Sequence, residues 1–331
     1  MEELKVAKKH FSKIGLCYLV GVAALFVLQI GLQALLAWLK PEWLENSNVV
    51  LFVLSFVPIY AVGMPLIILL MKKNVPAKAP EQHSMKVGQF VLAVMMCYCL
   101  MILGNLVGTV ITTLIGFVKG GAVDNVLLSA VGDTNMLLTV LYTVIAAPFA
   151  EEFIFRKLIV DSTVRYGQGV SIVLSGLMFG LFHGNLNQFA YAFLMGMFLA
   201  FLYVKTGKLK YTIGIHMIVN FVGSVIGLSL VKALNLDEYM EAASSGDPNA
   251  VMDAIMSNLP VWILYMVFVF VVFAVVITGI VLFIVFRKKF TVEPGEVVIP
   301  RKKRFSTVIL NLGMILYCLV WIGLMIWQLI V

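Results

Sequence analysis

The sequence contains very little charge for its length. Of its 331 residues only 12% are Asp, Glu, Lys or Arg, and 62% are hydrophobic, whereas soluble domains carry about 25% charged residues. This scarcity excludes an ordinary soluble protein and indicates helices that lie in a membrane. The longest polar loop, residues 232–258, is too short to fold alone, so no separate soluble domain is expected.

Several familiar motifs are also missing. The chain has no Gly-rich phosphate loop, no internal repeat, no Cys-based metal motif and no His-Glu-x-x-His zinc motif. Its four cysteines all fall within apolar runs and are interpreted as small buried hydrophobic residues. No cleavable signal peptide is expected, because the first apolar run is too long for one and ends without a small-residue cleavage site.

Long apolar runs are what the sequence has in abundance. Runs of mostly uncharged apolar residues mark candidate transmembrane helices. The resulting prediction is an all-α, polytopic membrane helical bundle of nine transmembrane helices, or eight if the last lies outside the core fold. The runs are 14–39, 49–71, 87–118, 135–160, 169–183, 188–204, 211–231, 259–286 and 306–330.

Basic residues fall almost entirely in alternate loops. With a cytoplasmic N-terminus, all but three of the 24 Lys and Arg residues face the cytoplasm, the exceptions being Lys40, Lys119 and Lys232. This is the distribution that the positive-inside rule describes. The net charge of +7 is therefore attributed to topology, so the expected partner is the lipid bilayer and not nucleic acid.

The chain is expected to divide into three parts. Residues 1–84 form an N-terminal two-helix extension, residues 85–231 a membrane core that carries the polar motifs, and residues 232–331 an outer loop followed by the C-terminal membrane helices. Within the core, Gly104, Gly108 and Gly116 favour a third span that is tilted or broken.

Five ionisable side chains lie inside the apolar runs with no evident access to water: Glu151, Glu152, Arg156, His183 and His216. A charged side chain near the middle of a bilayer costs about 2.5–3.5 kcal/mol on insertion scales, so such residues mark functional sites. Glu152 and Arg156 are spaced i,i+4 and are expected to pair. Glu151 points about 100° away around the helix, which leaves it free. Pro148 is expected to kink this helix by removing a backbone hydrogen bond.

The remaining polar residues are expected to converge on Glu151. His183 shares a helix face with Phe179, and His216 shares one with Asn220. The fifth and sixth runs are short, so they are interpreted as a hairpin whose turn, Gly184–Asn187, stops within the membrane and brings His183 to the depth of Glu151. Such a cluster can be interhelical glue, an ion or proton path, or a catalytic site.

The polar residues form three motifs that together resemble a known family. Glu151-Glu152-x3-Arg156, Phe179-x3-His183 and His216-x3-Asn220, in this order, resemble the CPBP family of intramembrane proteases. That family includes the type II CAAX prenyl endopeptidases and the bacterial Abi proteins of bacteriocin processing and immunity. The resemblance covers about residues 85–231. It implies that Glu151 activates a water held by His183, that His216 and Asn220 stabilise the oxyanion, and that Glu152 and Arg156 support the site.

The resemblance leaves the cofactor open. Glu151, His183 and His216 are possible ligands of zinc or another divalent metal, with room for a water. The absence of the helical zinc motif favours a metal-free or weakly metal-dependent mechanism, so neither a metalloprotease nor a glutamate-type enzyme is excluded.

The expected function is an intramembrane endopeptidase that cleaves a membrane-associated or lipid-modified protein or peptide substrate near the cytoplasmic face. The alternatives are a non-enzymatic bacteriocin-immunity or membrane scaffold protein, and an ion- or proton-coupled transporter. Short loops and the resemblance favour a multi-pass protein of a bacterial cell membrane.

Overall fold

The computed structural model describes residues 2–40, 42–43, 48–121, 123 and 135–330, and these residues form helices and loops but no strand. Eight of the described helices are long and apolar enough to cross a membrane, so the predicted polytopic all-α bundle is confirmed. Their bounds are Glu2–Leu39, Phe56–Asn74, Val87–Lys119, Met136–Tyr166, Leu186–Thr206, Leu209–Ala233, Leu259–Val285 and Leu312–Ile330.

The expected span that is not among these eight is the fifth run, the short helix α10 (Gln168–Phe182), with 15 residues. The alternative of eight spans was expected for another reason, and that reason is wrong, because the last helix packs against α10 and the first helix. At 1.5 Å per residue α10 is about 22 Å long, which is less than the thickness of a bilayer core. It packs against α11 (Leu186–Thr206) as a helical hairpin, as the sequence predicted. The turn between them includes Gly184, whose φ of +65° is a left-handed conformation that glycine adopts readily.

Three of the long helices change their winding along their length. The second consists of α3 (Asn48–Pro58), the π-helical turn η1 (Ile59–Gly63) and α4 (Met64–Asn74). The fourth runs through α7 (Met136–Thr139), η2 (Val140–Ala146), α8 (Ala147–Glu151), η3 (Glu152–Leu158), α9 (Ile159–Thr163) and η4 (Val164–Tyr166). The helix from Leu209 comprises α12 (Leu209–Asn220), η5 (Phe221–Gly227) and α13 (Leu228–Ala233). Like η1, the turns η2, η3 and η5 are π-helical, a feature that recurs at functional sites.

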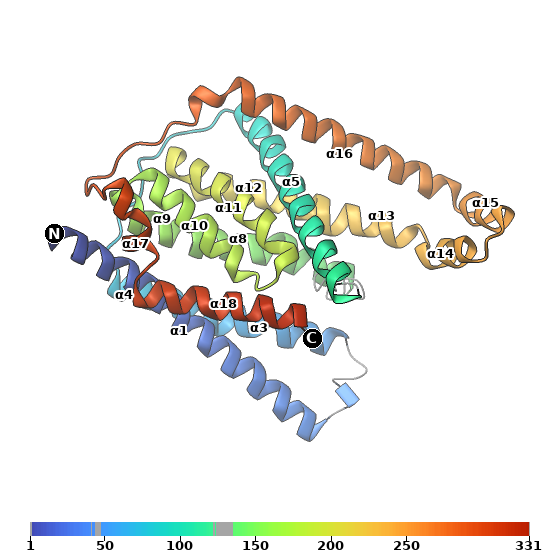
Figure 1. Ribbon diagram of the computed structural model, residues 1–331, viewed down its shortest axis with the longest axis horizontal. Coiled ribbons are helices and arrows are strands. Elements are labelled where there is room, and N and C mark those ends of the chain that lie inside the picture. Colours follow the sequence, from blue (N-terminus) through green and yellow to red (C-terminus); the bar gives the residue numbers. More distant parts are fainter. Residues whose placement is uncertain (1, 41, 44–47, 122, 124–134, 331) are drawn as a thin grey trace.

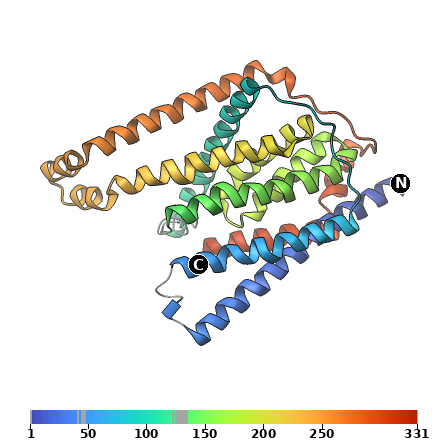
Figure 2. The ribbon, with the colours of Figure 1, turned by 180° about the vertical axis from the view of Figure 1, so that it is seen from behind.

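The helices are arranged around the segment that carries the polar motifs. On one side, α1 (Glu2–Leu39) packs against α4 and against α18 (Leu312–Ile330). On the other side, α5 (Val87–Lys119) packs against α11 and α16 (Leu259–Val285). The motif-bearing elements α8 to α12 lie between these two groups in both views (Figure 1, Figure 2). The predicted division into residues 1–84, 85–231 and 232–331 stays a prediction.

The first and last helices differ in length from their predicted spans. Helix α1 begins at Glu2 instead of residue 14, because its polar start packs on the core: His10 Nε2 lies 2.8 Å from the Ser162 carbonyl oxygen. At the other end, α17 (Arg304–Val308) is separated from α18 by a break. Asn311 Oδ1 accepts a hydrogen bond from the Met314 N–H (3.0 Å), which sets the start of α18 beyond the predicted residue 306.

Two short helices lie in the acidic loop, α14 (Leu236–Ser244) and α15 (Pro248–Ser257). The start of α15 follows from its sequence: Asp247 Oδ1 accepts the Asn249 N–H (2.9 Å), and Pro248 occupies the first turn, where no intrahelical N–H bond is needed.

The glycines of the third span serve close packing. Helix α5 is one unbroken helix, so of the two expectations for this span, tilted or broken, the break is wrong. A Cβ atom on Gly104 would overlap the backbone of Tyr191 on α11, and one on Gly108 would lie 2.7 Å from the Asn187 carbonyl oxygen. Because these glycines have no side chains, α5 can pack directly on the start of α11. This contact fixes the hairpin turn and, through it, the position of His183.

Replacing Gly104 by Ala is expected to destabilise the protein by about 1–3 kcal/mol, the usual cost of overpacking a core. The measurement is the thermal unfolding of the detergent-purified protein. Gly31→Ala is the matched control, because Gly31 has no atom within 4 Å of an added Cβ, and alanine favours a helix over glycine. Equal stability of the Gly104 variant and wild type would contradict the close approach.

Candidate active site

A buried network of opposite charges joins η3 to α12. Arg156 Nε lies 3.0 Å from Glu152 Oε2, and both side chains are 0% exposed. His216 Nδ1 lies 2.9 Å from the other carboxylate oxygen, Oε1. The predicted Glu152–Arg156 pair is thus present, and the structure adds a partner that sequence spacing did not show. Both oxygens of Glu152 are engaged, which makes this residue a brace between two helices.

The guanidinium of Arg156 is held largely by charge and by an aromatic ring. Its Cζ lies 4.2 Å from the centroid of the Phe179 ring, a cation–π contact. Within the described part of the chain, its nitrogens make no hydrogen bond of good geometry. Nε is close enough to Glu152 Oε2 for an ion pair, but the angle is unfavourable for a hydrogen bond. The fixed position of Arg156 therefore depends on the Glu152 carboxylate.

Glu151 occupies a different environment from its neighbour. It is the last residue of α8, its side chain is 15% exposed, and its Oε2 lies 3.8 Å from His216 Nε2. That separation is too long for a hydrogen bond, and contacts of this kind tighten when a substrate binds. The two adjacent acids therefore have different environments, and His216 lies close to both of them.

Phe179 brings the two histidines together. Its ring makes edge-to-face contacts with His183 (centroids 4.8 Å apart) and with His216 (5.8 Å). The predicted sharing of a face by Phe179 and His183 is confirmed, and the same ring also reaches α12. His183 Nδ1 lies 2.9 Å from the Phe179 carbonyl oxygen. A carbonyl only accepts, so Nδ1 carries the hydrogen and Nε2 keeps its lone pair.

Asn220 is positioned by a backbone carbonyl of another helix that has no backbone N–H donor. In the π-helical turn η2 the Ala147 N–H donates to Tyr142 O, so the next N–H, at residue 148, is the one that would reach Thr143 O. Pro148 has no N–H. The side-chain amide of Asn220 takes this place, with Nδ2 2.7 Å from Thr143 O. One of its two N–H groups is used in this way, and the other remains for a further acceptor.

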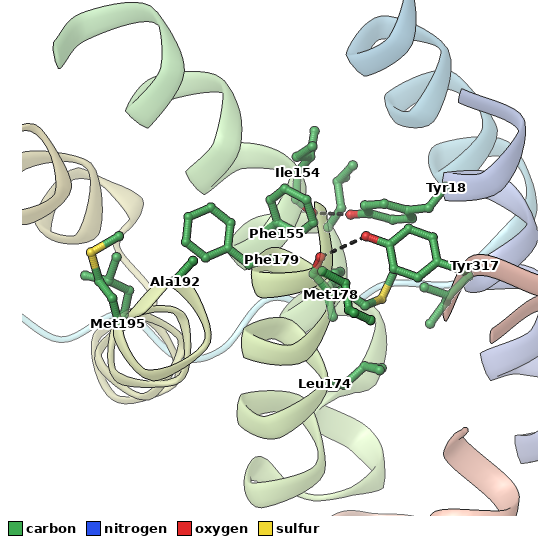
Figure 3. Close-up of a cluster of buried hydrophobic side chains, with 14 of the residues drawn as sticks. Tyr18, Ile154, Phe155, Leu174, Met178, Phe179, Ala192, Met195 and Tyr317 are labelled. Carbon is green, nitrogen blue, oxygen red and sulfur yellow. Dashed lines mark hydrogen bonds between the residues drawn. The ribbon is translucent and has the colours of Figure 1, made fainter. Parts of the chain in front are cut away.

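Three side-chain hydroxyl groups donate hydrogen bonds to backbone carbonyls of η3 and α10, the elements that carry the site. Tyr18 donates to the Ile154 carbonyl and Tyr317 to the Met178 carbonyl (2.8 Å), as Figure 3 shows. Ser175 Oγ donates to the Phe155 carbonyl, also at 2.8 Å. The two tyrosines come from α1 and α18, so helices outside the motif region fix the height of η3 and α10.

The hairpin turn contains a polar chain that spacing alone did not reveal. Asn185 Nδ2 donates to the His183 carbonyl (3.0 Å), and its Oδ1 accepts the Gln188 N–H (2.9 Å). Gln188 Nε2 in turn lies 2.6 Å from the hydroxyl of Tyr191, whose ring centroid is 6.3 Å from that of His183. One residue of this chain could have been identified from the sequence. Asn185 lies two positions after His183 and is a residue type favoured at a helix N-cap.

The metal hypothesis stays a prediction. No group of three or more His, Cys, Asp or Glu side chains in the described ranges is arranged to hold a metal ion. His216 Nδ1 is committed to Glu152 and His183 Nδ1 to a carbonyl, which leaves one nitrogen of each for any ligand role. Histidines that bind a metal are commonly oriented in this way by a carboxylate or carbonyl on the other ring nitrogen, so Glu151, His183 and His216 stay possible ligands.

The fold and the site together define a polytopic helical membrane protein with a buried glutamate–histidine centre. Residues 133–222 match the family model of Rce1-like proteins, described as type II CAAX prenyl endopeptidase Rce1-like. The matched range includes all three motifs, so the resemblance to the CPBP family is confirmed. No curated protein and no solved structure matches the chain.

Arg156→Ala is expected to cost about 3–5 kcal/mol of stability, because it leaves the Glu152 carboxylate buried without its cation. Lys78→Ala is the control: Lys78 also pairs with an acid, Nζ lying 2.9 Å from Glu296 Oε1, but the two side chains are 78% and 60% exposed. An exposed pair contributes at most about 1 kcal/mol. Similar melting temperatures for the two variants would show that Glu152 is solvated.

Proposed function

We propose that this protein is an intramembrane endopeptidase in which Glu151 and His183 activate a water for attack on a peptide bond. The observation that carries the proposal is the contrast between the adjacent glutamates. Glu152 is fully buried and engaged through both oxygens, whereas Glu151 keeps 15% exposure and approaches His216 Nε2 only to 3.8 Å. A general base needs this freedom, together with neighbours of fixed orientation.

His183 is suited to hold the water. Its Nδ1 hydrogen is occupied by the Phe179 carbonyl, so Nε2 is an acceptor and can receive one O–H of the water. Glu151 then takes the other proton as the water oxygen attacks the carbonyl carbon. The role of His183 depends on the hairpin turn, because that turn sets the end of α10.

Charge develops on the carbonyl oxygen as the new C–O bond forms. His216 Nε2, which faces Glu151, and the second N–H of Asn220 are the donors assigned to this oxyanion. An imidazole with hydrogens on both nitrogens can donate to Glu152 and to the oxyanion at once. Glu151 finally returns its proton to the leaving nitrogen as the C–N bond breaks, giving an amine and a carboxylic acid.

The substrate class proposed is a membrane-associated or lipid-modified protein or peptide. Its support is the apolar surroundings of the site and the match to CAAX prenyl endopeptidases. The cytoplasmic N-terminus, the bacterial cell membrane and the Abi-type assignment stay predictions of the sequence. The non-enzymatic immunity or scaffold role and the transporter stay the alternatives.

Glu151→Gln keeps the shape of the side chain and removes the base, so cleavage is expected to fall at least about 100-fold. The assay uses membranes of each variant with a quenched farnesylated CAAX-type peptide and with a membrane-anchored reporter protein. Glu241→Gln, on exposed α14, is the control and is expected to cleave like wild type.

A wild-type rate in Glu151→Gln would refute the catalytic assignment. Proton flux into proteoliposomes that is lost in His183→Ala and His216→Ala, without cleavage of either reporter, would instead favour the transporter.

A metal-free mechanism is proposed, and it predicts that wild type and His183→Ala contain the same near-zero amount of zinc after purification in buffers without chelator. Elemental analysis by mass spectrometry measures this content. About one zinc per wild-type chain, lost in His183→Ala, would show that the side chains rearrange into a metal site.

A further inference from the structure

A second feature of the molecule is a cavity of about 310 Å³ at the ends of three helices, away from the glutamate–histidine centre. It lies where α5 begins, α11 ends and α16 ends, next to the turn η6 (Arg287–Lys289). The views of the fold show the start of α5 and the end of α16 meeting at the same end of the molecule (Figure 1, Figure 2). Positive-inside topology places this end at the cytoplasmic face.

The inner wall of the cavity is apolar and preformed. It contains Leu92, Ala93 and Met96 on α5 and Phe198, Phe201 and Leu202 on α11. The Phe201 ring packs on Phe290 with centroids 5.0 Å apart, which fixes one side of the wall. Along α5 the lining extends from Gln89 to Met96, a rise of about 10 Å.

The inner end of the cavity is closed by a tight helix contact. Gly279 on α16 packs so closely on Cys99 that an added Cβ would overlap the cysteine side chain. Cys99 follows Met96 on α5 by about one helical turn. The two helices therefore touch at Cys99 and leave space between the start of α5 and the end of α16. The cavity is therefore closed between α5 and α16 at this end, and Lys205 and Lys289 lie on its lining.

The cavity also carries positive charge. Lys205 and Lys289 both line it, and Lys208 lies beside it with Nζ 2.8 Å from Ser84 Oγ. Lys205 is held in place by Gln168 (2.9 Å) and Glu293 (3.4 Å), which offsets part of its charge. Lys289 rests on the Phe286 ring at 5.0 Å and has no acidic partner within 4 Å in the described part of the chain. His83, which also lines the cavity, lies 3.8 Å from Glu81, whose side chain is 93% exposed.

We infer that this cavity binds an anionic phospholipid of the cytoplasmic leaflet, with part of an acyl chain against the phenylalanine wall and the phosphate at Lys289 and Lys205. An apolar wall about 10 Å long next to basic residues matches the two ends of such a lipid, and basic pockets on the cytoplasmic side of membrane helices suit anionic headgroups. The site is independent of the proposed proteolysis. Because Met96 precedes Cys97, which packs in the core around η3, a bound lipid would stabilise α5 next to the centre.

The test uses the full-length protein, delipidated in detergent, with lipid binding followed by native mass spectrometry and by thermal unfolding. The probes are phosphatidylglycerol, phosphatidylcholine with the same acyl chains, glycerol 3-phosphate and the neutral isoprenoid geranylgeraniol. Phosphatidylglycerol is expected to bind and to raise the melting temperature, and the other three are not. Lys289→Gln is expected to weaken phosphatidylglycerol binding about fivefold, since one basic residue near a membrane surface contributes about 1 kcal/mol.

Lys288→Gln is the matched control, because Lys288 is adjacent and exposed but does not line the cavity. It is expected to bind like wild type. Ala93→Leu fills the cavity from α5 and is expected to reduce binding while the charges stay in place. The proposal is overturned if phosphatidylcholine binds equally well, if glycerol 3-phosphate alone gives the effect, if geranylgeraniol competes for the site, or if the two lysine variants behave alike.

Discussion

Charged side chains are buried in this protein, and the need to compensate their charge is the constraint on which the structure depends. Glu152, Arg156 and His216 are almost wholly enclosed by apolar helices, where each uncompensated charge would cost several kcal/mol. They meet because η3 and α12 are held at one height, and that height is set by packing from the outer helices. The tyrosine hydroxyls of α1 and α18 contribute to it through the carbonyls of Ile154 and Met178. Thus the scaffold and the polar centre stabilise each other.

The same constraint separates the two glutamates. Once Glu152 neutralises Arg156 and orients His216, no second carboxylate is needed for structure, and Glu151 is left with space and partial exposure. Phe179 completes the arrangement, since a single ring contacts Arg156, His183 and His216. A rigid brace therefore lies beside a free acid, which is the division of labour expected of a preorganised catalytic centre.

Much of this organisation could be predicted from the sequence. Hydropathy predicted the membrane-spanning helices. The i,i+4 spacing predicted that Glu152 pairs with Arg156 and that Phe179 and His183 share one helix face. The short fifth segment was predicted as one arm of a hairpin because it is too short to span. The contact of His216 with Glu152 was missed, since it joins positions far apart in the chain and periodicity describes only one helix at a time. The glycines of α5 were misjudged for the same reason: their use depends on a neighbouring helix.

The polar chain of the hairpin turn shows where sequence reasoning stops. Asn185 is readable as a helix cap, but its link through Gln188 to Tyr191 depends on side-chain rotamers that a pattern does not encode. The π-helical turns are equally hidden, because no composition rule marks them, and they change which side chains face the centre.

Pro148 has a consequence that reaches beyond its own helix. By leaving the Thr143 carbonyl without a backbone donor, it creates the acceptor that the Asn220 amide occupies. Any other residue type at position 148 would supply an amide hydrogen and compete for that carbonyl. The two positions are therefore coupled through one oxygen atom. Across related sequences, the proline and the asparagine are expected to be inherited or lost together.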